Sequence, residues 1–91
     1  MKVKELIDLL QKADPEAVVL VAGYETMFTN MVASPDLVKT CKTVPHDVDS
    51  MYGNRELSTN GEPSVWIGWS KDYRGEAHIE AIEDPDLNKA G

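Results

Sequence analysis

The sequence predicts an α+β fold, in which an N-terminal helix packs on a small, mainly antiparallel sheet of three to five strands. Three observations lead to this prediction: an apolar stripe at helical spacing near the N-terminus, an apolar run directly after it, and two strand-like segments near the C-terminus. The 91 residues suit one domain with a modest core. We expect a single domain over residues 1–83 and a polar, frayed tail over residues 84–91.

The N-terminal helix is indicated by apolar residues that recur at helical spacing, with charged residues between them: Val3, Leu6, Ile7 and Leu10. A helix of about three turns is marginal alone in water, so this stripe needs a partner surface. Pro15 ends the helix because the residue before a proline is driven out of the helical conformation. Residues 14–17 are therefore expected to form a tight reversal of the chain.

Three later segments have strand character. Residues 18–21 are apolar without alternation, which suits a central strand covered on both faces. Residues 65–69 are rich in β-branched and aromatic side chains, and residues 77–82 alternate in part. The segment 70–75 between these two is polar and contains glycine, which predicts a hairpin loop.

The middle of the chain is less regular. Residues 36–44 alternate without a clean apolar face, which favours an edge strand protected by its lysines, and residues 27–32 could pair briefly. Residues 45–63 are polar, and long loops in compact domains are often functional. We therefore expect function in this long loop and treat the helix and strand before it as scaffold.

Trp66 and Trp69 are three residues apart, so they lie on opposite faces of their predicted strand. One of them is expected in the core. The other is expected at the surface, where tryptophan often anchors an interface. The pattern leaves open which one is exposed, and Trp69 is our candidate anchor.

Composition limits the function classes. Sixteen acidic residues against nine basic ones give a net charge of −7, which argues against direct nucleic-acid binding and suits either solubility or a basic partner. No apolar stretch is long enough to cross a membrane, and no signal peptide is expected at the charged start. With Cys41 as its one cysteine, the chain is expected to be cytoplasmic.

Catalytic and metal-binding patterns are weak. His46, Asp47 and Asp49 lie close together, but His78, the next candidate ligand, is distant in sequence, so we expect neither a metal nor a cofactor. Cys41 is better explained as a small buried hydrophobe than as a nucleophile with His46 as its base. A small hydrolase or metalloprotein is therefore the minority hypothesis.

Candidate binding residues gather after predicted strand ends and in the long loop, where rigid scaffolds commonly present ligand-binding groups. They provide aromatic planes, a planar cation and hydrogen-bonding groups. The candidate residues for partner or ligand binding are Tyr24, Glu25, Asn30, His46, Tyr52, Arg55 and Trp69.

The chain opens with the predicted helix Val-Lys-Glu-Leu-Ile at residues 3–7, then Asp14-Pro15, the apolar run and Gly23-Tyr24-Glu25. In these motifs it resembles a group of short uncharacterised phage and prophage proteins. Here Thr26 follows where those proteins often have glycines, and Asn54 follows Tyr52-Gly53 where they often carry histidine. The resemblance implies an accessory protein of a virus or mobile element and no particular activity.

The leading hypothesis is a noncatalytic accessory protein that binds and modulates a host protein in the host cytoplasm, through an acidic surface and an exposed aromatic residue. The alternative is a small-ligand module that sequesters a nucleotide-like signal, with Tyr24, Tyr52 and Arg55 as stacking and anion-pairing groups. The small core also favours a homodimer, since association buries further apolar surface.

Overall fold

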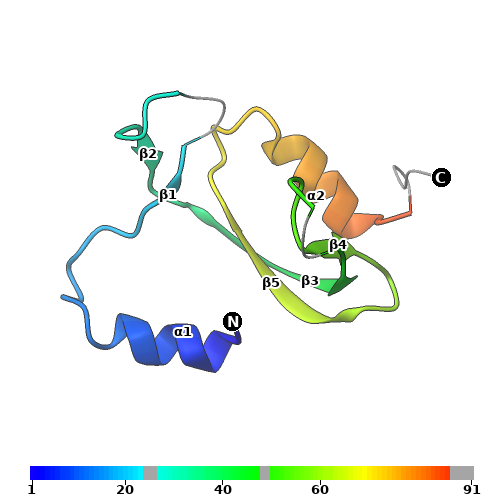
Figure 1. Cartoon of the computed structure of the whole chain (residues 1–91), viewed down its shortest axis with the longest axis horizontal. Coiled ribbons are helices and arrows are strands. Elements are labelled where there is room, and N and C mark those ends of the chain that lie inside the picture. The colour runs from blue at the N-terminus through cyan, green and yellow to red at the C-terminus, as the bar shows by residue number, and fades with distance from the viewer. Residues whose placement is uncertain (24–26, 48–49, 87–91) are drawn as a thin grey trace. The chain divides into compact units, whose positions relative to one another are not determined.

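The computed structural model describes residues 1–23, 27–47 and 50–86. It divides the chain into two compact units, Met1–Pro35 and Asp36–Gly91. The first unit contains a helix and a two-stranded antiparallel sheet, and the second contains a three-stranded antiparallel sheet and a helix (Figure 1). The predicted α+β class and the antiparallel pairing are confirmed. Within the predicted polar tail, residues 87–91 lie outside the described residues.

The first unit begins with the predicted helix, α1, which spans Val3–Leu10. Its apolar side chains are only partly covered: Leu6 is half-buried, and Ile7 remains 49% exposed. The reversal predicted after the helix is also confirmed. The N–H of Ala17 donates to the carbonyl of Asp14 at 2.9 Å, and the N–H of Glu16 donates to Asp14 Oδ1 at 2.9 Å, which is the local bonding that makes aspartate before proline a turn former.

The apolar run after this turn is mostly not a strand, so that prediction was wrong in its extent. Strand β1 covers only Val21–Ala22 and pairs with β2, Val32–Ala33. Val18, Val19 and Leu20 precede it and are 71%, 52% and 57% exposed. A strand requires a paired neighbour, and β2 supplies only two residues, so apolar composition alone does not extend the ladder.

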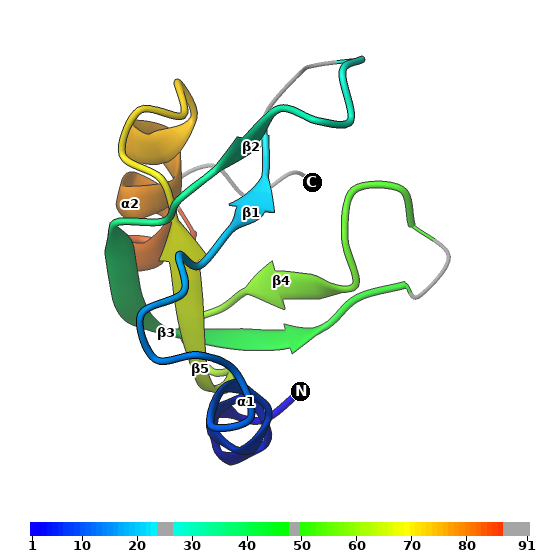
Figure 2. The ribbon, with the colours of Figure 1, turned by 90° about the vertical axis from the view of Figure 1, so that its left-hand side faces the viewer.

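The second unit is organised around β3, Leu37–Pro45, which pairs on one side with β4, Arg55–Leu57, and on the other with β5, Glu62–Gly68 (Figure 2). The strand predicted at residues 65–69 is confirmed over residues 65–68, which belong to β5, while Trp69 follows the strand. The prediction of an edge strand over residues 36–44 was wrong, because β3 is the central strand. Its polar residues are tolerated because one helix covers only part of one face of this sheet.

The predicted loop over residues 45–63 contains β4 and the start of β5. A tight turn connects these strands, with the N–H of Gly61 donating to the carbonyl of Ser58 at 3.3 Å. A side chain at Gly61 would collide with the backbone of Thr43, so glycine is required where the turn passes the central strand.

The register of β3 with β5 separates the side chains of the sheet into two faces. Leu37 lies opposite Gly68, Lys39 opposite Trp66 and Cys41 opposite Ser64. Residues directly opposite in an antiparallel pair project to the same face, and successive residues alternate. One face, here called the helix-bearing face, holds these odd-numbered β3 residues. The other, here called the open face, includes Val38, Thr40, Val65 and Ile67.

The C-terminal segment is a helix, so the strand predicted at residues 77–82 and the hairpin loop before it were wrong. Helix α2 spans Gly75–Glu83 and packs against β3. Its half-buried residues, His78, Ile79, Ala81 and Ile82, follow helical spacing. A window of six residues cannot separate partial alternation from this pattern. The missed signal was the favourable helix propensity of its alanines and glutamates.

A close contact between a glycine and a tryptophan lies under α2. The indole of Trp66 covers Gly68, and its centroid is 5.6 Å from that of the His78 ring. A Cβ at Gly68 would overlap the outer atoms of the indole. The absence of a side chain at residue 68 therefore sets the position of Trp66, which is half-buried.

Asp36 connects the beginning of β3 to the chain that leaves β5. Its carboxylate accepts hydrogen bonds from the Ser70 hydroxyl at 2.6 Å and from the Ser70 N–H at 2.8 Å, while its own N–H donates to the carbonyl of Gly68 at 3.0 Å. The hydroxyl and then the backbone N–H hold the pKa of Asp36 below its ordinary value.

No described helix has the length and apolar character needed to span a membrane.

The contact between Gly68 and Trp66 makes a stability prediction. We expect Gly68→Ala to lower the free energy of unfolding by about 1–3 kcal/mol, because the indole must leave its position against His78. Gly75→Ala is the matched control, since a Cβ there would have ordinary contacts, the nearest at 3.5 Å. The control should be neutral or slightly stabilising. Urea unfolding measures both variants, and equal losses would contradict the prediction.

The bonding of Asp36 predicts a pH effect with a defined sign. Its pKa is depressed in the folded state, so its contribution is complete above the unfolded value of about 4 and is lost as the pH falls through the folded pKa. In an NMR titration, Ser70→Ala should raise the pKa of Asp36 toward its ordinary value. Asp72 is an internal control: its pKa is lowered by hydrogen bonds with Arg74 and should stay low in this variant. An unchanged pKa for Asp36 would refute this role of Ser70.

Candidate functional site

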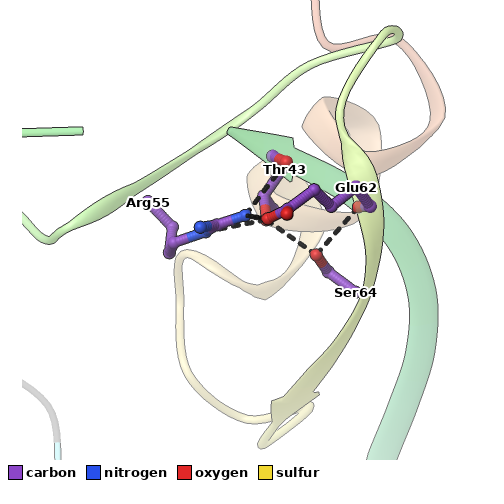
Figure 3. Close-up of polar contacts among 4 residues, drawn as sticks. All are labelled: Thr43, Arg55, Glu62 and Ser64. Atoms are coloured by element: carbon purple, nitrogen blue, oxygen red, sulfur yellow. Dashed lines mark hydrogen bonds and ion pairs between the residues drawn. The ribbon is translucent and has the colours of Figure 1, made fainter. Parts of the chain in front are cut away.

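A polar cluster joins all three strands on the helix-bearing face. It consists of Thr43 in β3, Arg55 in β4, and Glu62 and Ser64 in β5 (Figure 3). Arg55 Nη2 lies 2.5 Å from Glu62 Oε2, and Arg55 Nε donates to Thr43 Oγ1 at 3.1 Å. Thr43 Oγ1 and Ser64 Oγ share a hydrogen bond of 2.7 Å. The register places these residues side by side although they are separated by up to 21 positions in sequence.

This cluster is better suited to hold the strands together than to bind a ligand. Arg55 Nη2 also donates to the Thr43 carbonyl at 3.1 Å, so the guanidinium bonds to both the side chain and the backbone of β3. The carboxylate of Glu62 balances its charge. Arg55 was the anion-pairing group of the ligand-binding alternative, and a phosphate would have to displace these protein acceptors to bind it.

Cys41 and His46 do not form a nucleophile and base. Cys41 lies on the helix-bearing face, whereas His46, the residue after the end of β3, lies beside Glu56 on the other face. His46 Nδ1 lies 3.6 Å from Glu56 Oε2, whose residue pairs with Val44 on the open face. Partial burial raises the pKa of the Cys41 thiol, which disfavours the reactive thiolate. Half-buried Cys41 fits the small hydrophobe that the sequence indicated.

The other predicted binding residues do not come together. Tyr24 and Glu25 lie outside the described residues, and Asn30 belongs to the first unit. Tyr52 is 99% exposed beside a turn in which its N–H donates to Ser50 Oγ at 3.1 Å. His46 lies beside Glu56 of the open face, whereas Arg55 bonds to Thr43 on the helix-bearing face.

The residues weighed as metal ligands under the minority hypothesis are not gathered into one site either. Asp49 lies outside the described residues, and His78 is on α2 beside Trp66. Within residues 1–23, 27–47 and 50–86, no group of three or more histidine, cysteine, aspartate or glutamate side chains is placed to hold a metal ion. The enzymatic hypothesis thus has no constellation of described residues in its favour, and it stays a prediction.

An apolar surface on the open face was missed by sequence reasoning. Val38 lies opposite Ile67, and Thr40 lies opposite Val65, so the four side chains form a contiguous block. Val38 is 70% exposed, Val65 43% and Ile67 40%. Trp69, the predicted anchor, follows Ile67 by two positions and is 36% exposed. The signal available in the sequence was the alternation of Val65 and Ile67 with Trp66, but its partner strand could not be assigned.

The polar cluster makes a prediction with a matched control. Thr43→Val should lower the free energy of unfolding by about 1 kcal/mol, since it removes the hydroxyl that Arg55 and Ser64 share while keeping the side-chain shape. Thr40→Val makes the same chemical change on the open face of the same strand and should cost less. Urea unfolding of both variants tests this, and an equal or larger loss for Thr40→Val would show that the cluster is not stabilising.

Comparison of the chain with protein-family models, with curated proteins and with solved structures gave no significant match. The resemblance of its opening to phage proteins therefore stays a prediction.

Proposed function

We propose that this protein is a noncatalytic protein-binding module and that the open face of its second unit is the binding surface. The observation that carries the proposal is the exposure of Val38, Val65 and Ile67 in one block of a regular sheet. Single exposed apolar residues are ordinary on protein surfaces, but a contiguous group on a rigid element is typical of an interaction site.

The position of Trp69 supports this proposal. It follows β5 directly and continues the alternation of Val65 and Ile67. Tryptophan at the border of an apolar patch can fill a pocket on a partner and donate one hydrogen bond from its indole, which is why it is enriched among residues that dominate binding energy.

The charge of α2 indicates a partner with basic character. Glu76, Glu80 and Glu83 are exposed on the helix, and its last turn carries no basic residue. Carboxylates at a helix C-terminus oppose the helix dipole, and like charges four residues apart repel each other. Helix α2 lies on the helix-bearing face, so a partner on the open face would relieve these terms only if basic residues reached around the sheet edge. The net charge of −7 is the broader argument for a basic host protein, in line with the accessory role that the resemblance implies.

The structure favours this function over the nucleotide-binding alternative through Arg55. That alternative requires an available cation near an aromatic plane, whereas the Arg55 guanidinium bonds to Thr43 and Glu62. The open face offers apolar side chains, which suit the core of a protein interface.

The proposal predicts which substitution abolishes binding. The tagged full chain is used to capture a specific partner from lysate of its natural host. Val38→Lys should reduce the amount of partner recovered at least about tenfold, because binding would bury the new charge. Val18→Lys is the matched control, since Val18 is 71% exposed and Val38 is 70% exposed, but Val18 lies in the other unit. Quantitative mass spectrometry at low and high salt measures the recovery.

Recovery of no specific partner, or equal loss with both lysine variants, would overturn the assignment of the open face. If the unchanged chain retains its partner at high salt and Val38→Lys loses it, the affinity comes mainly from apolar contact. Loss of binding at high salt in the unchanged chain would show the electrostatic contribution, since screening acts on exposed charges.

A further inference from the structure

Among the described strands of the second unit, β5 has the longest unpaired edge, on its outer side. The strand pairs with β3 on one side and with no other strand among the described residues. A seven-residue edge with apolar side chains is a template for pairing with another chain. The backbone groups that this edge presents decide which partner strand it can pair with.

The hydrogen bonds of β3 show which residues of β5 point toward β3 and which point outward. The N–H of Ser58 donates to the carbonyl of Lys42 at 3.0 Å, and the N–H of His46 donates to the carbonyl of Asn54 at 2.9 Å. The even-numbered residues of β3 thus bond toward β4, and the odd-numbered ones bond toward β5, because an antiparallel ladder alternates. Their partners in β5 are Glu62, Ser64, Trp66 and Gly68.

The groups that point away from β3 are consequently those of Pro63, Val65 and Ile67. Pro63 has no N–H, so the outer edge presents donors at Val65 and Ile67 only. A proline at this end restricts which strands can pair here, since its ring faces any strand that extends past it.

We propose that β5 pairs antiparallel with β5 of a second copy of the chain, about a two-fold axis at Trp66. In this register Val65 lies opposite Ile67 of the second copy, and Ile67 lies opposite its Val65. The N–H and C=O groups of both residues then find partners across the axis. Because each residue has the same relation to its counterpart, the contact is isologous and closes as a dimer.

Neighbouring registers are less favourable. An axis at Val65 would put Ile67 opposite Pro63 of the second copy, so the Ile67 carbonyl would face a ring without a donor. An axis at Ser64 would place Val65 opposite Pro63 and lose the donor there as well. Pro63 thus disfavours the registers on its side of Trp66. On the other side, an axis at Ile67 would put Val65 opposite Trp69, which lies past the end of β5 and whose carbonyl already accepts from the Asp72 N–H at 3.1 Å.

The side chains on both faces suit this axis. On the open face, the opposed β-branched Val65 and Ile67 form apolar cross-strand pairs and join the two open faces into one surface. On the helix-bearing face, the two Trp66 residues become direct neighbours at a position that favours aromatic pairs. Helix α2 packs against β3, which pairs with the edge of β5 opposite to the outer one.

Electrostatic repulsion along the shared edge is small in this register. Glu62 is the only charged residue of β5 and lies four positions from the axis. The two copies of Glu62 would be about 26 Å apart at roughly 3.3 Å per residue, well beyond the Debye length of about 8 Å at physiological salt. This separation, the self-matching donors and the symmetric apolar pairs favour a second copy over an unrelated strand.

Sedimentation of the purified full chain tests the dimer independently of the proposed host partner. We expect a dimer population that rises between about 10 µM and 1 mM, because the interface is small. Val65→Pro removes an outward N–H without touching the ladder to β3, and it should weaken the dimer by roughly tenfold or more. Val65→Thr keeps that N–H and should retain most of the dimer. Circular dichroism and urea unfolding check that each variant folds.

Cysteine cross-linking tests the register. In a background of Cys41→Ser, a mixture of Val65→Cys and Ile67→Cys chains should form mainly mixed disulfides between the two variants. Dominant Val65→Cys homodisulfides would place the axis at Val65 and overturn the proposed register. A monomer at every concentration, or an undiminished dimer in Val65→Pro, would overturn pairing through this edge.

Discussion

The seven-residue pairing of β3 with β5 is the constraint on which the second unit depends. The register of this pairing places Cys41, Ser64 and Trp66 on the helix-bearing face. It places Val38, Val65 and Ile67 on the other face. A shift by one residue would exchange the faces of one strand. Two contacts at one end help to fix the pairing: the carboxylate of Asp36 binds Ser70, and the indole of Trp66 lies over Gly68.

The sequence was informative where a pattern is local. The stripe of α1, the turn at Asp14 and the β-branched run of β5 each depend on neighbours within a few positions, and the structure has all three. Helix α2 was misread because its apolar residues are few and its length is only nine residues. The helix is anchored through Trp66, and such a contact between distant segments leaves little trace in a short window.

The candidate surfaces could not be predicted for a different reason. Arg55 was identified as a binding residue because it is a cation in a polar segment, yet its role depends on Thr43, twelve positions away in sequence. The open face likewise requires the pairing of Val38 with Ile67, which are 29 positions apart with β4 between them. Single residues can be nominated from sequence, but their grouping is a property of the register.

The second unit leaves much of its apolar surface unburied, and this connects its stability to its binding surfaces. Helix α2 packs on the other face, so Val38 stays 70% exposed on the open face and contributes little through burial within the unit. The exposed edge of such a sheet can pair with strands of unrelated chains. Pro63 limits that hazard because it removes one donor and leaves a short stretch that is satisfied in one register. The same proline that weakens β5 as a general template makes it specific for its own copy.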